Sequence, residues 1–158
     1  MLKSFATFAA ALVIAATGAR AETWNIDPSH SSVGFSVRHL VVSKVPGSFK
    51  DFSGSLEWDG KNLATGTVEF TIQSASVSTD NEKRDGHLKS PDFFAVDSFP
   101  TLTYKSTKVT PGQGENFKLT GNLTIRGVTK EVTFDCIFNG TQATPWGFTA
   151  AAFSAVTT

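Results

Sequence analysis

Apolar and polar side chains alternate with a period of two along most of this chain. In TVEFTIQ, residues 67–73, every second residue is Val, Phe or Ile and the residues between them are polar. Alternation of this kind buries one face of a β-strand and leaves the other face in water. The same pattern recurs at residues 33–39, 53–59, 101–107, 116–127, 131–138 and 147–156. The sequence therefore predicts an all-β protein with roughly seven antiparallel strands.

Short turn-forming sequences separate these runs at the spacing of a meander. They are Asp59-Gly60, residues 111–114, Arg126-Gly127 and Asn139-Gly140. Glycine next to Asp, Asn or Pro favours the tight turns that join antiparallel strands. We therefore expect each strand to pair with a neighbour that is close in the sequence.

One short helix is expected at residues 81–90. Thr79 or Asp80 could open it, with Glu82 placed for a capping box. Pro91 should end it, because the residue before a proline is pushed out of helical geometry. No other segment has a convincing helical pattern.

A sheet of this kind must hide its apolar face, either against a second sheet or by closing on itself. A barrel of about eight strands is wide enough to be filled by side chains or to hold one small ligand. A composition with 14 Phe residues agrees with either interior. The choice between them decides the function, and composition leaves it open.

The first 21 residues are typical of a secretory signal peptide. Lys3 precedes an uncharged, apolar run at residues 5–18, and residues 19–21 (ARA) fit the small-x-small pattern that a signal peptidase cleaves. We expect cleavage after Ala21, export to a bacterial periplasm, and a single folded domain at residues 22–158. No later segment has the roughly 18 consecutive apolar residues of a membrane-spanning helix.

The expected mature chain is nearly neutral and has a single cysteine. Removing Lys3 and Arg20 leaves 12 of the 14 basic residues against 14 acidic ones, a net charge of about −2. Lys and Arg are not clustered, so nucleic acid and anionic membranes are not expected partners. Because Cys136 is the only cysteine in the sequence, an internal disulfide is excluded. Because it lies on the apolar side of its strand, we expect a buried thiol.

The three histidines do not form a recognisable catalytic or metal-binding motif. His30, His39 and His87 lack the i, i+4 spacing of a helical metal site, and no Cys or Glu completes a ligand set. A G-x-S-x-G sequence and glycine-rich phosphate loops are also missing. A Ser-His-Asp arrangement assembled from distant residues stays open. The sequence predicts no metal and no cofactor.

The stretch RDGHLKSPDFF, residues 84–94, joins a polar cluster to two large apolar residues. Such charges usually form the solvated face of a short helix. Phe93 and Phe94 follow at once and lead into the strand at 101–107, so the cluster could instead rim an apolar interior. A third interpretation is an enzyme that uses His87 with Asp85 or Asp92.

Three blocks of the sequence, and their order, resemble the YceI-like, polyisoprenoid-binding family. They are WNIDPSHSSVGFSVRHL at 24–40, RDGHLKSPDFFAVDSFPTLTYKST at 84–107 and GNLTIRGVTKEVTF at 121–134. The resemblance implies an antiparallel, lipocalin-like extended β-barrel with a short helix. It also implies a protein that binds and carries a long-chain isoprenoid lipid, of quinone or polyprenyl-phosphate type, and is not an enzyme. Members of the family continue beyond the strand at 147–156, so we expect this chain to lack closing strands and the barrel to be unclosed. An open edge invites pairing, which leaves a homodimer open.

On this resemblance, two groups of residues are expected to contact the lipid. The apolar wall would consist of Phe35, Val37, Phe70, Ile72, Phe94, Leu102, Tyr104, Leu119 and Phe134. The polar head group would meet Arg84, His87 and Lys89, with Arg38 and His39 as a second set. The competing interpretations are the enzyme that uses His87 and a packed scaffold module without a cavity.

Overall fold

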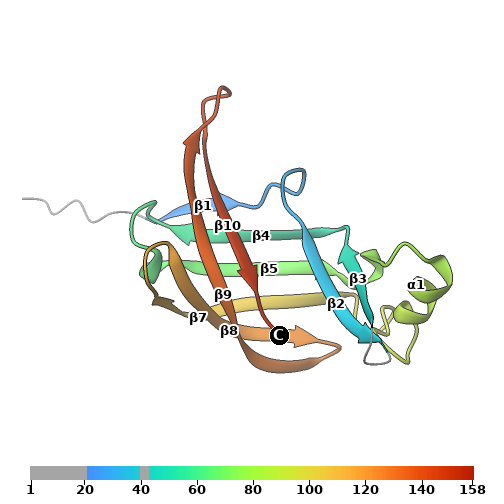
Figure 1. Cartoon of the computed structure of the whole chain (residues 1–158). Helices are drawn as coiled ribbons and strands as arrows, with labels where there is room; N and C mark the ends of the chain where they lie inside the picture. The colour runs from blue at the N-terminus through green and yellow to red at the C-terminus, as the bar shows by residue number, and fades with distance from the viewer. Residues whose placement is uncertain (1–20, 40–42) are drawn as a thin grey trace, which may run out of the picture.

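The computed structural model describes residues 21–39 and 43–158, so the expected signal peptide lies outside the described residues except for its last residue, Ala21. The strands are β1 Glu22–Asn25, β2 Val33–His39, β3 Ser43–Phe49, β4 Phe52–Trp58, β5 Thr67–Gln73, β6 Val77–Ser78, β7 Thr101–Pro111, β8 Asn116–Ile125, β9 Val128–Ala143 and β10 Thr149–Val156. One α-helix, α1, spans Glu82–Lys89, and two short 3₁₀ turns, η1 Leu63–Thr65 and η2 Ser74–Ser76, flank β5 (Figure 1).

The strands form one large and one small antiparallel sheet. The large sheet has the order β1-β4-β5-β7-β8-β9-β10, and the small sheet has the order β2-β3-β6. Strands β1 and β10 are the two edges of the large sheet and do not pair with each other. The predicted all-β, antiparallel, unclosed barrel with one short helix is therefore confirmed.

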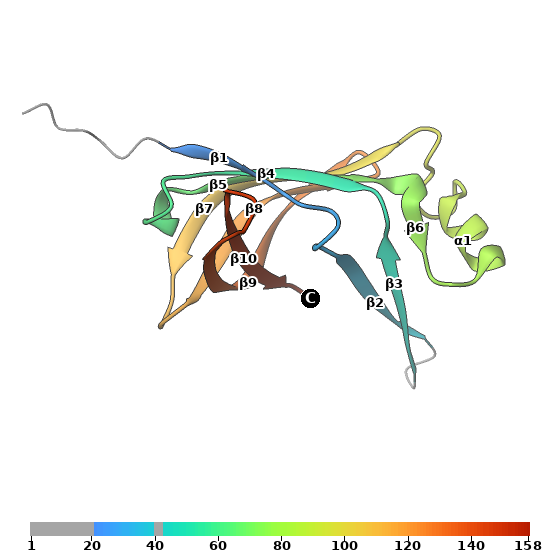
Figure 2. The ribbon, with the colours of Figure 1, turned by 90° about the horizontal axis from the view of Figure 1, so that it is seen from above.

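The large sheet curls until strands far apart in its order come into contact (Figure 2). Trp58 at the end of β4 packs edge-to-face on Phe138 of β9, with ring centroids 5.6 Å apart. Strands β5, β7 and β8 lie between these two strands in the sheet, so a flat sheet could not bring the rings together. Trp58 also packs on Phe153 of β10, at 6.1 Å. The apolar face is thus the concave face of a half-barrel.

Alternation located seven strands but missed three. The runs at 33–39, 53–59, 67–73, 101–107, 116–127, 131–138 and 147–156 correspond to β2, β4, β5, β7, β8, β9 and β10. Strand β3 was missed because Pro46-Gly47 is typical of a turn. Proline is tolerated there because β3 pairs with β6 only through Ser48 and Phe49, so Pro46 lies on an edge stretch. Strands β1 and β6 are too short to show a period.

The predicted turns are confirmed at two hairpins and wrong at a third position. Arg126 and Gly127 join β8 to β9 with φ of 50° and 71°, the left-handed pair that a tight hairpin requires. Residues 111–114 join β7 to β8. Asn139-Gly140 is not a turn: it lies inside β9, where Gly140 pairs with Ala152 and Phe138 with Phe153, so Asn139 is the extra residue of a β-bulge.

The helix is confirmed, but its predicted cap is wrong. Asn81 is the N-cap, and its side chain accepts a hydrogen bond from the backbone N–H of Arg84 at 3.0 Å. An Asn side chain satisfies an unpaired N–H of the first turn as well as the predicted Thr79 or Asp80 would. Ser90, directly before Pro91, is extended, so the helix ends where the proline predicts.

Candidate functional site

Four of the nine predicted wall residues lie where the small sheet and α1 cover the large sheet. Phe49, Val77 and Leu102 are buried at its centre, and Val33, Phe35, Ile72, Leu88 and Phe94 pack against them. Phe35 and Phe94 both lie against Phe49, with ring centroids 5.5 and 5.6 Å away. Of the predicted wall, Phe35, Ile72, Phe94 and Leu102 belong to this first cluster.

Four more lie on the concave face of β5, β7, β8 and β9. Tyr104, Leu119 and Cys136 are buried, and Val68, Phe70, Val109, Phe117, Leu123 and Phe134 pack against them. Phe70, Tyr104, Leu119 and Phe134 are the predicted members of this second cluster. Val37, by contrast, is 56% exposed and belongs to neither cluster. By alternation it is on the same side of β2 as Phe35, so it extends the apolar face as an uncovered residue.

Two aromatic rings of this wall lie close to glycines of the next strand. Phe35 pairs with Gly47 in register, and a Cβ atom at Gly47 would come within 2.3 Å of the Phe35 ring. A Cβ atom at Gly121 would likewise come within 2.7 Å of the Tyr104 ring. At Gly121 the Cβ atom would also meet the Lys105 carbonyl oxygen, so a larger residue at either glycine would have to displace the ring or the neighbouring strand.

The wall ends in an aromatic group that the sequence interpretation missed. Trp24, Trp58, Phe138 and Phe153 meet around Trp58, which is 2% exposed. Trp24 Nε1 donates to the Trp58 carbonyl oxygen at 3.3 Å, whereas Trp58 Nε1 is buried without a hydrogen-bond partner among the described residues. The continued alternation of Gly54, Leu56 and Trp58 along β4 was the signal that could have revealed it.

The apolar face carries no charge near neutral pH. Burial raises the pKa of the Tyr104 hydroxyl to about 12 and that of the Cys136 thiol to about 11. The Tyr104 hydroxyl donates to the Leu119 carbonyl oxygen at 3.0 Å, so its polar end is satisfied inside the protein. The burial predicted for Cys136 is confirmed, since it is 4% exposed.

The two leading recesses in the described part of the chain are small or polar. One, of about 90 Å³, lies beside the β7–β8 turn and is lined by Leu63, Val109 and Phe117 among others. The other, of about 280 Å³, is lined by polar residues that include Ser53, Ser55 and Glu69. Neither is an enclosed apolar bore. The barrel interior implied by the resemblance is, among the described residues, an open concave face (Figure 2), which is called the trough below.

Two charged residues of the stretch 84–94 hold α1 in place. The Asp85 carboxylate accepts hydrogen bonds from the backbone N–H and the hydroxyl of Thr79. The Arg84 guanidinium donates to the Thr79 hydroxyl at 2.7 Å and to the Thr79 carbonyl oxygen at 2.9 Å. The hydrogen bond from the Thr79 side chain lowers the pKa of Asp85. Both charges therefore fix the helix to the chain that follows β6.

His87 pairs with Asp92 at the surface. Its Nε2 lies 3.2 Å from Asp92 Oδ2, and both side chains are more than half exposed. The imidazole also packs edge-on against Phe93, 4.9 Å away. Arg126, in the β8–β9 turn, donates to the Phe93 carbonyl oxygen at 3.0 Å. An exposed ion pair of this kind contributes little stability, and Asp85, the other proposed acid, is occupied by Thr79.

The structure does not gather all the predicted head-group residues. Arg84, His87 and Lys89 share α1. Arg38 is an exposed residue of β2 and pairs in register with Lys44 of β3, not with a residue of α1. His39 ends β2, and its side chain lies outside the described residues. The α1 end thus offers one cationic group and the β2–β3 hairpin another.

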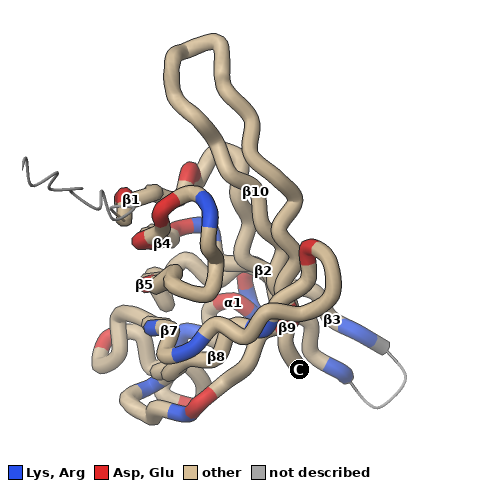
Figure 3. The backbone as a smooth tube through the Cα atoms, turned by 90° about the vertical axis from the view of Figure 1, so that its left-hand side faces the viewer, with Lys and Arg blue, Asp and Glu red and all other residues tan. Residues whose placement is uncertain are grey.

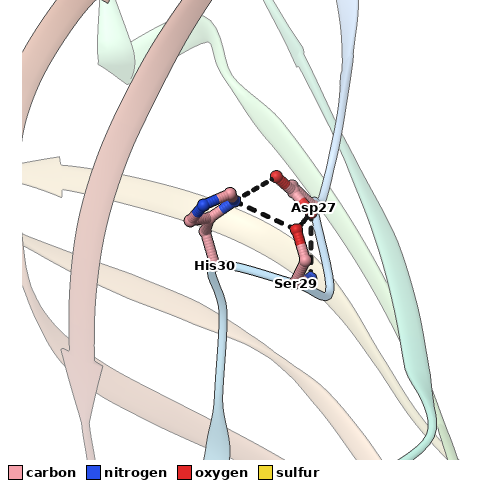
Figure 4. A network of polar contacts seen from close by, with 3 residues as sticks. All are labelled: Asp27, Ser29 and His30. Carbon is pink, nitrogen blue, oxygen red and sulfur yellow. Dashed lines mark hydrogen bonds and ion pairs between the residues drawn. The ribbon is translucent and has the colours of Figure 1, made fainter.

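Asp27, Ser29 and His30 form a polar network that resembles a catalytic triad only in composition (Figure 4). Asp27 Oδ2 and Ser29 Oγ lie 2.7 and 3.0 Å from the same ring nitrogen, His30 Nδ1. A triad needs the acid on one ring nitrogen and the nucleophile on the other. Hydrogen bonds from Ser29 and His30 lower the pKa of Asp27 to about 2, so the network is an Asx-type turn that stabilises the loop between β1 and β2.

Two further features are absent from the described residues. Residues 21–39 and 43–158 hold no group of three or more His, Cys, Asp or Glu side chains placed to bind a metal ion. Over the same residues, no helix is long and apolar enough to cross a membrane.

Comparisons with known proteins place the chain among relatives of one kind. The YceI-like domain matches residues 24–158. The protein YceI of Salmonella newport is 40% identical over 158 residues, which cover 98% of this chain and 82% of the relative. A UPF0312 protein of Staphylococcus aureus is 45% identical over 122 residues, 77% of this chain and 68% of the relative. The crystal structure of a Campylobacter jejuni YceI protein has a TM-score of 0.68 and 36% identity, covering 82% of this chain and 76% of that one.

Proposed function

Because this chain belongs to the YceI-like family, we propose that it binds and carries a long-chain isoprenoid lipid along the concave face of its half-barrel. The observation that carries this proposal is the continuity of the apolar face. The first and second clusters adjoin on β5 and β7, where the pair Ile72–Leu102 is followed on the same face by the pair Phe70–Tyr104. Phe117 of the second cluster packs on Phe153 of the aromatic group around Trp58. Its buried Tyr104 and Cys136 stay neutral. A wall of this kind suits an unbranched or repeating hydrocarbon chain better than a polar metabolite.

The expected affinity follows from the size of the ligand. At roughly −0.3 kcal/mol per non-hydrogen atom, a tail of about 40 carbons gains about −12 kcal/mol. This free energy corresponds to a dissociation constant of about 1 nM. A shorter tail covers less of the face, so affinity should rise with the number of isoprene units.

The polar end of the lipid is proposed to lie at α1. Arg84 is held by Thr79, which leaves His87, Lys89 and Arg126 of the β8–β9 turn as cations for the head group. His87 and Arg126 are exposed, and Lys89 is half-buried. Cations at the end of an apolar trough favour a pyrophosphate through charge-assisted hydrogen bonds, and a quinone ring through weaker polar contacts. A Lys89→Ala variant should lose affinity for a polyprenyl pyrophosphate and keep affinity for a quinone. Equal affinity of both lipids for the variant and the wild type would contradict this placement.

We propose binding without chemical turnover. The enzyme alternative rests on His87, whose ring has Asp92 as its side-chain hydrogen-bond partner among the described residues. The His87–Asp92 pair is exposed, and no nucleophilic side chain among the described residues is hydrogen-bonded to the His87 ring. The geometry therefore does not support the enzyme alternative. A carrier releases its lipid intact, and recovery of a modified lipid after incubation would favour the enzyme.

Export to the periplasm is also a proposal, and it rests on the sequence of residues 1–21. Fractionation of the producing bacterium should find a mature chain that begins at Glu22 outside the inner membrane. An intact N-terminus in the cytosolic fraction would contradict export.

The binding experiment compares two exposed apolar residues on opposite faces of the strands. Val37, on the apolar side of β2, is 56% exposed, and Ile137, on the outer side of β9, is 45% exposed. An acid at either position costs the fold little, because neither side chain is buried. Val37→Asp should weaken the binding of a long-chain isoprenoid, since the ligand would desolvate the carboxylate, whereas Ile137→Asp should not. Equal affinities for the two variants would overturn the proposed face.

A further inference from the structure

The β9–β10 hairpin presents two stacked aromatic rings at its tip. Trp146 is 79% exposed and Phe148 is 56% exposed. Their ring centroids lie 6.2 Å apart with 18° between the ring planes. Two large apolar side chains uncovered side by side are unusual on a soluble protein and mark a site of interaction.

The turn that carries these rings is held in place by its own hydrogen bonds. The backbone N–H and the hydroxyl of Thr144 both donate to the Phe148 carbonyl oxygen at 2.8 Å. The N–H of Gly147 donates to the Thr144 carbonyl oxygen at 3.2 Å, and Gly147 has a φ of 86°, which favours glycine. The rings are thus displayed on a preformed turn, so a partner need not order it.

The tip lies at the end of a ribbon that stands away from the rest of the protein. The pairing of β9 with β8 ends at Ile137, so beyond Phe138 strand β9 pairs only with β10 in the described part of the sheet. Figure 1 shows the hairpin extending past β1 and β4. A two-stranded ribbon of this kind has little packing of its own, so the rings at its end can reach a surface that the half-barrel does not touch.

The ribbon also lacks charge. Residues 136–158 contain no Asp, Glu, Lys, Arg or His, and Figure 3 shows no acidic or basic residue on the part of the hairpin that projects from the half-barrel. A charged group entering the edge of a bilayer must lose its hydration, whereas Trp gathers at the membrane–water interface. The chemistry of the tip therefore matches the headgroup region of an uncharged bilayer.

We propose that the tip, Thr144–Phe148, docks the protein on a lipid bilayer by inserting Trp146 and Phe148 among the headgroups. A protein partner fits less well, because a stable protein interface buries about 1,000 Å² or more and a five-residue turn cannot supply that area. A second copy pairing at the edge of the sheet would use the backbone of β10 and not these rings. The purpose of this docking rests on the proposed function. Docking would bring the apolar trough next to the membrane that holds the lipid.

The test uses the full chain with vesicles of phosphatidylcholine alone, without any isoprenoid. The wild type should sediment with the vesicles, and acyl-chain bromines should quench Trp146. Trp58 is buried and Trp24 is half-buried, so the change in fluorescence reports mainly on Trp146. The double variant Trp146→Ser/Phe148→Ser should weaken sedimentation by about tenfold or more, because it removes both apolar anchors.

Two controls separate docking from other effects. Trp146→Phe keeps an aromatic anchor, so it should retain sedimentation and lose the quenching signal. Ile137→Ser removes an exposed apolar residue elsewhere on β9 and should change neither. Unchanged sedimentation of the double variant, or no sedimentation of the wild type, would overturn the proposal. Loss of a concentration-dependent dimer in the double variant would overturn it in favour of a second copy. Binding of a detergent-solubilised isoprenoid should survive in the double variant, so failure of docking and failure of lipid binding are distinguishable.

Discussion

The buried indole of Trp58 makes an unusual prediction about stability. The side chain is 2% exposed and contacts the rings of Trp24, Phe138 and Phe153. Its Nε1–H, however, is buried without a hydrogen-bond partner among the described residues. Trp58→Ala removes the whole ring, and Trp58→Phe keeps an aromatic ring while deleting the N–H group.

The two substitutions should differ widely in cost. Loss of a buried Trp side chain to Ala costs about 3–5 kcal/mol of the free energy of unfolding. Trp58→Phe removes three ring atoms, worth about 2 kcal/mol at about 0.8 kcal/mol per buried CH₂ group. It also relieves an unpaired buried donor, which costs about 1–3 kcal/mol. The two contributions nearly cancel, so Trp58→Phe should change stability by no more than about 1 kcal/mol.

Urea unfolding followed by far-ultraviolet circular dichroism measures both variants, because the unfolding transition is dominated by the backbone signal and each variant is fitted with its own baselines. A shift in midpoint at constant slope then reports the change in stability. If Trp58→Phe proves as destabilising as Trp58→Ala, the N–H group has a partner in solution, and the reasoning from an unpaired donor fails.

Three further predictions concern single residues. Burial raises the pKa of the Cys136 thiol to about 11. Ellman's reagent at pH 8 should therefore react slowly with the native protein and at once with the protein unfolded in urea. Rapid reaction of the native protein would show that Cys136 is exposed in solution. The folded pKa of Asp27, about 2, lies below its ordinary value of 3.8, so the stability it contributes is present above about pH 4 and lost as the pH falls towards about 2. Carboxyl NMR titration should find this value in the wild type, and an ordinary value would refute the network with Ser29 and His30. Thr79→Val should cost about 1–3 kcal/mol in urea unfolding, because it leaves Arg84 and Asp85 without their shared hydroxyl; an unchanged midpoint would show that α1 does not depend on it.

Local sequence patterns predicted those strands and turns whose conformation depends mainly on residues close in the sequence. Alternation in residues 67–73 and 116–127 marked strands because one face is buried and the other wet. The left-handed conformations of Arg126 and Gly127 confirm a turn that the residue types alone specify. Pro46, in contrast, forms part of a strand. It pairs with β2 on one side only, so no second strand requires the backbone N–H that proline lacks. That arrangement depends on the neighbouring strands and cannot be read from residues 43–49 alone.

The apolar character of the candidate site was predictable from the sequence, but how far the sheet curls around it was not. The buried wall residues fall into two clusters because their alternation places them on the inner face. The contact of Trp58 with Phe138 depends on how far the sheet curls, which no short stretch encodes. The charges of Arg84 and Asp85 suggested a ligand site. Their common partner, Thr79, lies five and six residues away and is apparent only once the helix is folded.

The most direct test of lipid binding is mass spectrometry of an organic extract of the protein purified from its own bacterium. Our account predicts one long-chain isoprenoid lipid in stoichiometric amount, with its head group intact. It also predicts that the Val37→Asp protein yields less of this lipid than the Ile137→Asp protein. An extract without stoichiometric lipid, or equal amounts from the two variants, would contradict the proposal that the concave apolar face carries an isoprenoid.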